Sequence, residues 1–396
     1  MALLTHPGLA PAMGRLGTET AFAVLARARQ LEAQGRDVIH LEIGEPDFDT
    51  PANIIEAAKR ALDDGFTHYG PSAGLPEARA AIAAHVGESR GIVIDPDEIV
   101  VTPGAKPIMY FAITALCGPG DEVLYPDPGF PIYESVVDFV GATPVPLALR
   151  PEREFRLDLD ELRDKLSPRT KLLILNSPQN PTGGVLEPAD IRAIGELLAD
   201  HDAYVLSDEI YCRIMYGEIE HASIAAEPGM RDRTIILDGF SKTYAMTGWR
   251  MGYGVMPADL ASAFSQLQTN ITSCTASFIQ IAGIEALQGP QDAAAEMVAE
   301  FKARRDQVVD GLNAIPGVSC QRPAGAFYVF PQLSGFDRDA DEIAARLLDE
   351  AGVAVLAGSA FGDVGRDSLR LSYANSRENL REGVRRMSDW LAGARA

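Results

Sequence analysis

Residues 239–252 read Gly-Phe-Ser-Lys-Thr-Tyr-Ala-Met-Thr-Gly-Trp-Arg-Met-Gly and come shortly after an apolar run, Thr234–Leu237. The run predicts a buried strand, so Lys242 lies just beyond a strand end. A buried ammonium group is costly in free energy unless it is neutral, paired or used covalently, and a lysine that forms a Schiff base needs such a setting. The hydroxyl of Ser241 and the planar guanidinium of Arg250 are suited to binding a phosphate. We therefore expect a covalent site that also binds phosphate.

Short apolar runs like this one recur along the chain. The predicted strands are Glu98–Thr102, Asp121–Tyr125, Lys171–Leu175, Ala203–Ser207 and Thr234–Leu237. Each is nearly continuous in hydrophobicity, which is typical of a parallel strand covered on both faces. Between them lie helical stretches that begin with a proline, which a first helical turn tolerates: Pro76–Val86, Pro188–Ala199 and Pro257–Gln268. This alternation predicts an α/β fold with a mostly parallel sheet covered by helices.

Polar and glycine-rich segments follow four of these strands. They are residues 103–106 (Pro-Gly-Ala-Lys), 176–183 (Asn-Ser-Pro-Gln-Asn-Pro-Thr-Gly), 208–211 (Asp-Glu-Ile-Tyr) and the lysine segment 239–252. In an open α/β sheet, ligands bind at the carboxyl ends of the strands, so we expect one site assembled from several loops. Gly104-Ala105-Lys106 opens a predicted helix, whose free N–H groups make a seat for phosphate. The nucleotide-binding patterns of a Walker loop and of a Rossmann fold are both absent from this segment.

The regular alternation of apolar strands and helices ends near Gly289. A long charged helix is predicted over Asp292–Asn313, followed by strands at Phe327–Phe330 and Leu369–Tyr373 and by helices at Asp341–Ala351 and Arg377–Ala392. We expect a smaller α+β domain here, with the helical segment Thr20–Gln34 packed against it. The predicted division is an N-terminal arm with part of the small domain at residues 1–49, a large domain at 50–288 and a small C-terminal domain at 289–396.

Composition excludes several classes of protein. The 396 residues are 46% hydrophobic and 23% charged, and the formal net charge is −21, which argues against a nucleic-acid surface. No apolar run approaches the ~18 residues of a membrane span, and Met1 to Gly17 lack the features of a signal peptide. We expect a cytoplasmic protein. The four cysteines (Cys117, Cys212, Cys274 and Cys320) form no C-x-x-C pair, so we expect free thiols, with no disulfide framework and no metal site.

Residues 239–252 resemble, at every position, the lysine signature of the class I/II aminotransferases that depend on pyridoxal 5′-phosphate (PLP). Further motifs of that family follow the same order along the chain: Ile43-Gly44-Glu45-Pro46-Asp47-Phe48, Tyr69-Gly70 with Gly74-Leu75, Asn180-Pro181-Thr182-Gly183, Asp208-Glu209-Ile210-Tyr211, Gly325-Ala326-Phe327-Tyr328 and Arg370-Leu371-Ser372-Tyr373. The resemblance spans roughly residues 15 to 390. It implies the PLP-dependent transferase type I fold and a homodimer with active sites at the subunit interface.

The resemblance also implies a role for each of these residues. Lys242 would carry PLP as a Schiff base and then move a proton between the substrate Cα and the cofactor C4′. Asp208 would keep the pyridine nitrogen protonated. Arg370 would bind the substrate α-carboxylate, helped by the backbone of Gly44. The remaining cofactor contacts would be the phosphate ligands Gly104, Ala105, Lys106, Ser241, Arg250 and the partner subunit's Tyr69, the ring-stacking Phe130, and Asn180 and Tyr211 at the phenolic oxygen, with Phe130 and Asn180 also facing the substrate.

The implied activity is transfer of an amino group between an L-amino acid and a 2-oxo acid, with aspartate or glutamate and 2-oxoglutarate as candidate substrates. The resemblance is closest to a bacterial branch of aspartate and broad-specificity enzymes. A second arginine for a distal carboxylate is not evident in residues 270–275, and the Lys106 side chain is the alternative ligand. Phe22 instead favours apolar or aromatic substrates, and His68 is expected to be a surface or interface residue.

Two other classes of protein stay open. One is a PLP-dependent lyase or specialised biosynthetic enzyme on the same fold, since these reactions share the same lysine chemistry. The second is a transcriptional regulator with an aminotransferase-like domain, which the short N-terminal segment and the negative charge disfavour.

Overall fold

The structure is a computed structural model, and residues 8–217 and 219–394 are described. The first seven residues of the predicted N-terminal arm lie outside this range. The helices are α1 (Ala21–Ala33), α2 (Ala52–Asp63), α3 (Pro76–Arg90), α4 (Lys106–Leu116), α5 (Ile132–Val140), α6 (Leu159–Lys165), α7 (Pro188–Leu198), α8 (Ala258–Ile271), α9 (Ser277–Gln288), α10 (Asp292–Asn313), α11 (Ala340–Arg346) and α12 (Arg377–Ala394).

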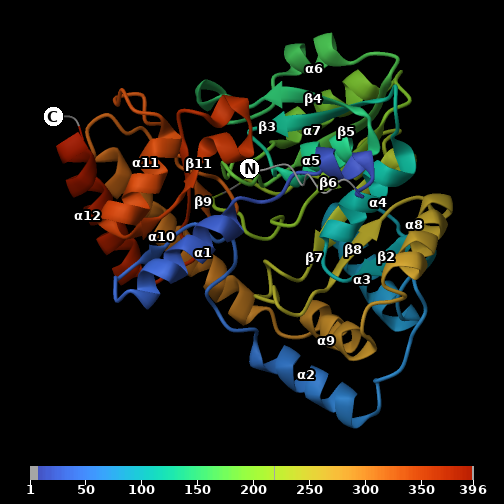
Figure 1. Ribbon diagram of the computed structural model, residues 1–396. Coiled ribbons are helices and arrows are strands. Elements are labelled where there is room, and N and C mark those ends of the chain that lie inside the picture. The colour runs from blue at the N-terminus through green and yellow to red at the C-terminus, as the bar shows by residue number, and fades with distance from the viewer. Residues whose placement is uncertain (1–7, 218, 395–396) are drawn as a thin grey trace.

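A seven-stranded sheet lies at the centre of the larger part of the molecule (Figure 1). Its strands, in spatial order, are β2 (Ile99–Thr102), β8 (Gly252–Val255), β7 (Thr234–Gly239), β6 (Tyr204–Asp208), β5 (Thr170–Asn176), β3 (Glu122–Asp127) and β4 (Thr143–Ala148). The pairs from β7 to β4 are parallel, and only β8 runs antiparallel to its neighbours. The predicted α/β fold with a mostly parallel sheet is therefore confirmed.

Helices cover both faces of this sheet, which makes three layers. Along β5, Leu172 and Ile174 pack in one hydrophobic cluster with α4 and α5, whereas Leu173 and Leu175 pack in another cluster with α6 and α7. Successive residues of a strand point to opposite faces, so a strand between two helical layers has apolar side chains at every position. This is the physical origin of the continuous apolar runs in the sequence.

Two strands of the sheet were not predicted, and both lack the usual apolar pattern. Strand β4 contains Pro144 and Pro146, and proline is tolerated there because β4 is an edge strand. Strand β8 begins at Gly252, where a Cβ atom would come within 2.4 Å of the Ala105 nitrogen. Only glycine fits this close approach of two backbones.

The C-terminal part of the chain forms smaller sheets. Strands β11 (Leu356–Ala357), β12 (Leu369–Ser372) and β9 (Tyr328–Val329) make one antiparallel sheet, and β1 (Ile39–His40) pairs with β10 (Val353–Ala354). The predicted helix over residues 341–351 is instead α11 followed by a π-helical turn at Leu347–Ala351. The domain boundaries at 49/50 and 288/289 stay predictions.

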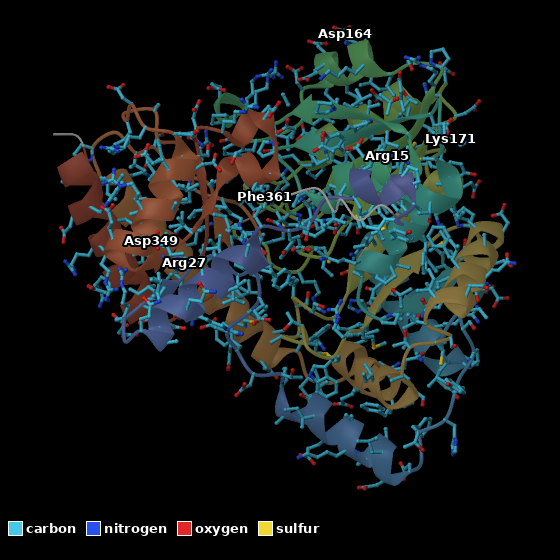
Figure 2. The ribbon with its side chains drawn as sticks, viewed as in Figure 1. Arg15, Arg27, Asp164, Lys171, Asp349 and Phe361 are labelled. Carbon is cyan, nitrogen blue, oxygen red and sulfur yellow. The ribbon has the colours of Figure 1, made fainter. Side chains whose placement is uncertain are left out.

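Helix α1 packs on this C-terminal part, although it comes from the start of the chain (Figure 1). Ala28 and Leu31 of α1 cluster with Leu348 and Ala354. Arg27 forms an ion pair of 2.9 Å with Asp349, and Figure 2 shows the two side chains next to each other. The expected packing of residues 20–34 is confirmed.

No disulfide links the four cysteines, so the expectation of free thiols is confirmed. Within residues 8–217 and 219–394, no helix has the length and apolarity needed to cross a bilayer. The same residues contain no group of histidine, cysteine and carboxylate side chains that could hold a metal ion.

Candidate active site

The carboxyl ends of the central strands meet at one edge of the large sheet. Strand β8 is antiparallel to both β7 and β2, so β2 points in the same direction as the parallel strands. Consequently Thr102 at the end of β2 and Gly239 at the end of β7 both lie opposite Gly252. A cavity of about 480 Å³ opens at this edge, which is within the usual size range of a small-molecule site.

Most of the predicted site residues line this cavity. They are Gly44, Ala105, Lys106, Phe130, Asn180, Asp208, Tyr211, Ser241, Lys242, Arg250 and Arg370. Gly104 lies behind the lining, against Arg250. Tyr69 lies outside the lining with 90% of its surface exposed, and His68 beside it is also exposed.

Lys242 is enclosed by protein and borders the cavity. Its Nζ donates a hydrogen bond of 2.5 Å to the carbonyl oxygen of Gly44. A Cβ atom at position 44 would lie 2.1 Å from the Tyr328 hydroxyl, so only glycine allows the Tyr328 side chain to come this close to the backbone. Burial lowers the pKa of the Lys242 ammonium to about 8; the charge of Glu45 opposes this shift, and those of Arg370 and Arg250 add to it.

Asp208 is the last residue of β6, one position beyond the predicted end of that strand. Its Oδ2 accepts a hydrogen bond of 2.6 Å from the hydroxyl of Tyr133, and its Oδ1 accepts one of 3.2 Å from the backbone N–H of Ile210. Burial raises the pKa of the Asp208 carboxyl to about 6, although both hydrogen bonds oppose this shift. A cationic partner on the cavity side of Asp208 would lower the pKa of this carboxyl again.

Arg370 lies in β12, and its side chain enters the cavity from the smaller sheets. The guanidinium carbon is 4.6 Å from the centre of the Tyr328 ring and 4.9 Å from that of Phe361. Nη1 donates to Asn180 Oδ1 at 3.2 Å, and Nη2 donates to the carbonyl of Glu42. Among the described residues, Nε has no hydrogen-bond partner although it is buried. A buried donor without a partner suits a fixed binding group for an anion.

A second cluster of hydrogen-bond donors surrounds Arg250. A Cβ atom on Gly104 would lie 2.1 Å from Arg250 Nη2, so glycine leaves room for the guanidinium beside the start of α4. The cap residue of α4, Ala105, provides no side-chain acceptor for the first N–H groups of the helix. Together with the Ser241 hydroxyl, these donors could hold a dianionic phosphate.

The cavity also contains residues to which the sequence analysis assigned no role. Tyr133 binds Asp208, Tyr328 shares a hydrogen bond of 2.8 Å with the Tyr211 hydroxyl, and Asn176 and Glu19 complete the wall. Tyr133 lies in the first turn of α5, and no pattern in the sequence marks it as a site residue. Glu19 precedes α1 in a loop, where no pattern in the sequence points to the site.

A PLP molecule fits this set of side chains. The donors around Arg250 match its phosphate, Asp208 at the end of β6 matches a pyridinium nitrogen, and the Lys242 amine matches its aldehyde. The cavity is large enough to hold an amino acid beside PLP, and the unpartnered Nε of Arg370 is a donor available to bind it.

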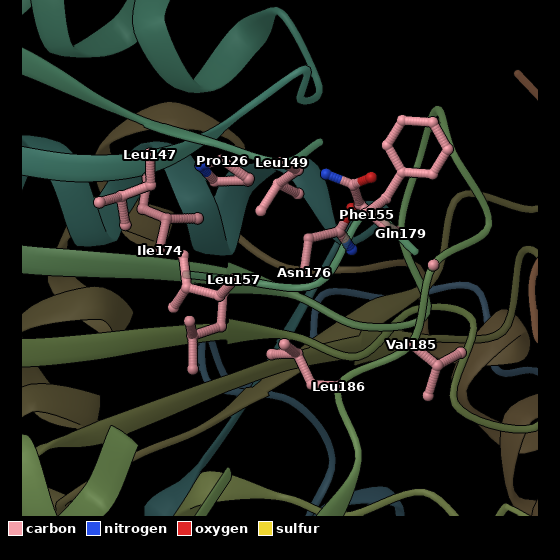
Figure 3. Close-up of a pocket in the computed structure, with 12 residues that line it drawn as sticks. Pro126, Leu147, Leu149, Phe155, Leu157, Ile174, Asn176, Gln179, Val185 and Leu186 are labelled. Atoms are coloured by element: carbon pink, nitrogen blue, oxygen red, sulfur yellow. The ribbon is translucent and has the colours of Figure 1, made fainter. Parts of the chain in front are cut away.

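A separate cavity of about 20 Å³ lies behind the site among apolar side chains such as Leu147, Leu149 and Phe155 (Figure 3). Asn176 borders both cavities. Since the small one holds about the volume of a single water molecule, it is a packing gap in the core.

Comparisons with known proteins agree with this geometry. A family model described as aminotransferase class I and II matches residues 36–387. The chain is 42% identical to an aspartate aminotransferase of Pyrococcus horikoshii over 93% of both chains, and 41% identical to an aspartate/prephenate aminotransferase of Cereibacter sphaeroides over 97% and 99%. The solved structure of an aromatic aminotransferase from Pyrococcus horikoshii superposes with a TM-score of 0.88 at 42% identity, over 92% of this chain and 99% of that one.

Proposed function

Because the chain belongs to the class I and II aminotransferase family, we propose that it carries PLP on Lys242 and takes its amino group from L-aspartate. The protein is an aminotransferase, which moves an amino group between an amino acid and a 2-oxo acid. The observation that carries the cofactor proposal is the convergence of Lys242, Asp208 and Arg250 in one cavity. Aspartate is proposed because relatives at about 40% identity are named aspartate or aspartate/prephenate aminotransferases.

When bound, PLP supplies an aldehyde for the substrate amine and a protonated ring that accepts the electron pair released from Cα. The side chains of this protein then hold the substrate and move its proton. With a pKa lowered to about 8, about a tenth of Lys242 is neutral at pH 7, compared with far less at its ordinary pKa. The neutral Nζ is the proposed base for the Cα proton. Asp208, fixed by Tyr133, holds a proton at the ring nitrogen.

Arg370 orients the substrate through its α-carboxylate. Its guanidinium stacks against Tyr328 and Phe361, so the direction of its donors is set by packing. A carboxylate bound to it would place Cα near Lys242, which turns proton transfer into a step between neighbours. Asn180 and Tyr211 would orient the cofactor ring at its phenolic oxygen, with Phe130 against its face.

Lys106 is the candidate ligand for a second, distal carboxylate of aspartate. Its Nζ lies 5.2 Å from the centre of the Phe130 ring at the cavity wall. Phe22 and Leu25 line the same cavity, and Phe22 is 62% exposed. This apolar wall favours a second candidate activity, on aromatic or other apolar amino acids.

The proposal includes a cytoplasmic homodimer that acts on amino acids and 2-oxo acids, with the domain division at residues 49/50 and 288/289. Tyr69 would complete the phosphate site of the partner subunit. The test of the activity is a panel of amino acids offered with 2-oxoglutarate or pyruvate, with identification of the products. We expect glutamate and oxaloacetate from aspartate and 2-oxoglutarate; decarboxylated or eliminated products would instead favour a lyase.

A further inference from the structure

Four cationic side chains among the described residues line the active-site cavity: Lys106, Lys242, Arg250 and Arg370. Under the proposed function, three of them are engaged with the cofactor or the α-carboxylate. This leaves Lys106 for any further anionic group of a substrate, and its side chain is 49% exposed at the cavity wall.

Lys106 already has an anionic partner in the cavity. The ammonium group forms an ion pair with the carboxylate of Glu19, which is itself only 20% exposed and also lines the cavity. The other glutamate of the lining, Glu45, is held elsewhere, since it accepts a hydrogen bond of 2.9 Å from Thr247. The charge of Lys106 is therefore matched before any substrate enters.

The segment that carries Glu19 bridges the two parts of the molecule. Just before it, the Arg15 side chain donates to backbone carbonyls of Asp138 and Phe139, and the Gly17 N–H donates to the Ser135 hydroxyl at 2.8 Å. Just after it, α1 packs on the smaller sheets. Both flanks are held, so the Glu19 carboxylate stays beside Lys106.

We propose that Glu19 lowers the preference of this site for dicarboxylic substrates by competing with their distal carboxylate for Lys106. This inference rests on the proposed function. A neutral substrate side chain leaves the ion pair intact. A distal carboxylate must either displace Glu19 from Lys106 or share Lys106 with it, so that two anions lie beside one cation. Glu19 thus lowers the preference for dicarboxylates and permits apolar substrates, which the wall formed by Phe22 and Leu25 accommodates.

The test is Glu19→Gln in the PLP-loaded enzyme, which keeps the shape of the side chain and removes its charge. An ion pair of this exposure is worth up to about fivefold in an equilibrium constant, so kcat/KM for aspartate should rise about threefold to fivefold. The value for phenylalanine should change less than about twofold. Calorimetry should show the same gain in affinity for succinate, which has two carboxylates and no amine to transfer. Glu77→Gln, at an exposed position of α3, is the matched control and should change none of these values.

A double-mutant cycle separates competition for Lys106 from a general charge effect. In a Lys106→Met background, Glu19→Gln should no longer raise the affinity for succinate, because nothing remains to be released. An unchanged succinate affinity in Glu19→Gln alone, or an equal gain in the Lys106→Met background, overturns the inference. If aspartate is no substrate for any variant while phenylalanine is, the proposed donor is wrong, and the succinate measurements still judge the role of Glu19.

Discussion

At the scale of single residues, Lys242 has chemistry that should depend on pH in the neutral range. Burial lowers its pKa from the ordinary value of 10.5 to about 8. The neutral amine is the form that attacks an aldehyde, and for a lysine with a lowered pKa this form prevails above that pKa. Reactivity should therefore rise as pH increases toward 8 and level off above it.

We predict this profile for the rate at which protein freed of cofactor combines with added PLP. The rate, followed by absorbance between about pH 6.5 and 9.5, should fall close to tenfold per pH unit well below 8. Borohydride reduction and mass mapping should place the adduct on Lys242, and Lys242→Arg is the control that should form none there. A rate that keeps climbing to pH 9.5 would mean that Lys242 has its ordinary pKa.

At the scale of elements, Arg370 extends from a strand of the smaller sheets into a cavity formed mainly by the large one. We predict that Arg370→Lys keeps the charge but loses the planar fork, so it should not restore function. The value of kcat/KM should fall at least ~100-fold for both the amino donor and the 2-oxo acid, since positioning is lost along with binding. PLP occupancy, measured by absorbance, should stay unchanged. Loss of PLP, or slowing of one side-chain class alone, would contradict the assignment to the α-carboxylate.

Helix α3 is joined to the end of the sheet by a buried charge network that the proposed chemistry does not use. Arg90 Nε donates to Glu209 at 2.9 Å and Nη2 to Asp238 at 3.0 Å, with all three side chains at most 5% exposed. Ser207 and Ser223 also donate to Glu209. Removing the cation would leave Asp238 without the cation it pairs with, and Glu209 with His221, 2.9 Å away, as its remaining basic partner. Such a loss is far more costly than breaking an exposed pair.

We predict that Arg90→Met lowers the free energy of unfolding by about 3–5 kcal/mol in denaturant titrations. Arg163→Met is the matched control, because it breaks an ion pair with Asp160 in which both side chains are more than half exposed. The control should cost at most about 1 kcal/mol. Equal losses in the two variants would show that the buried network contributes no more than a surface pair.

The sequence predicted those parts of the site that directly follow apolar strands. Asp208 and Lys242 could be found because each comes after a mainly apolar run, and chain direction in a parallel sheet then brings them to one edge. The antiparallel strand β8 was not predicted because it begins with a glycine, which carries no apolar signal. Glycine is required at position 252 because the backbone of Ala105 lies so close. Tyr133 and Glu19 reach the cavity through tertiary packing, which the local pattern of residues does not encode.

At the scale of the whole molecule, Tyr69 is a predicted site residue that lies away from the cavity of its own subunit. Tyr69 lies on the loop between α2 and α3, and its side chain is 90% exposed. Tyrosine side chains are usually at least partly buried. Ser241, Arg250 and the start of α4, the proposed phosphate site, line the cavity of the same chain without Tyr69. The proposed dimer accounts for this arrangement, because an isologous interface would bring each Tyr69 to the other subunit's site.

We predict that two inactive variants restore activity when they are combined. Lys242→Ala lacks the proposed cofactor lysine, and Tyr69→Ala should bind PLP more weakly and lose most of its turnover. In a mixed dimer, one site has the Lys242 of one subunit and the Tyr69 of the other, and so it is intact. Co-expression in equal amounts should give about a quarter of the sites of the native enzyme, since about half of the dimers are mixed and each has one intact site of two. Tagging the variants differently allows the mixed dimer to be isolated and assayed. Full activity of Tyr69→Ala alone, or no activity in the isolated mixed dimer while each variant still dimerises by light scattering, would mean that the two subunits do not share their sites.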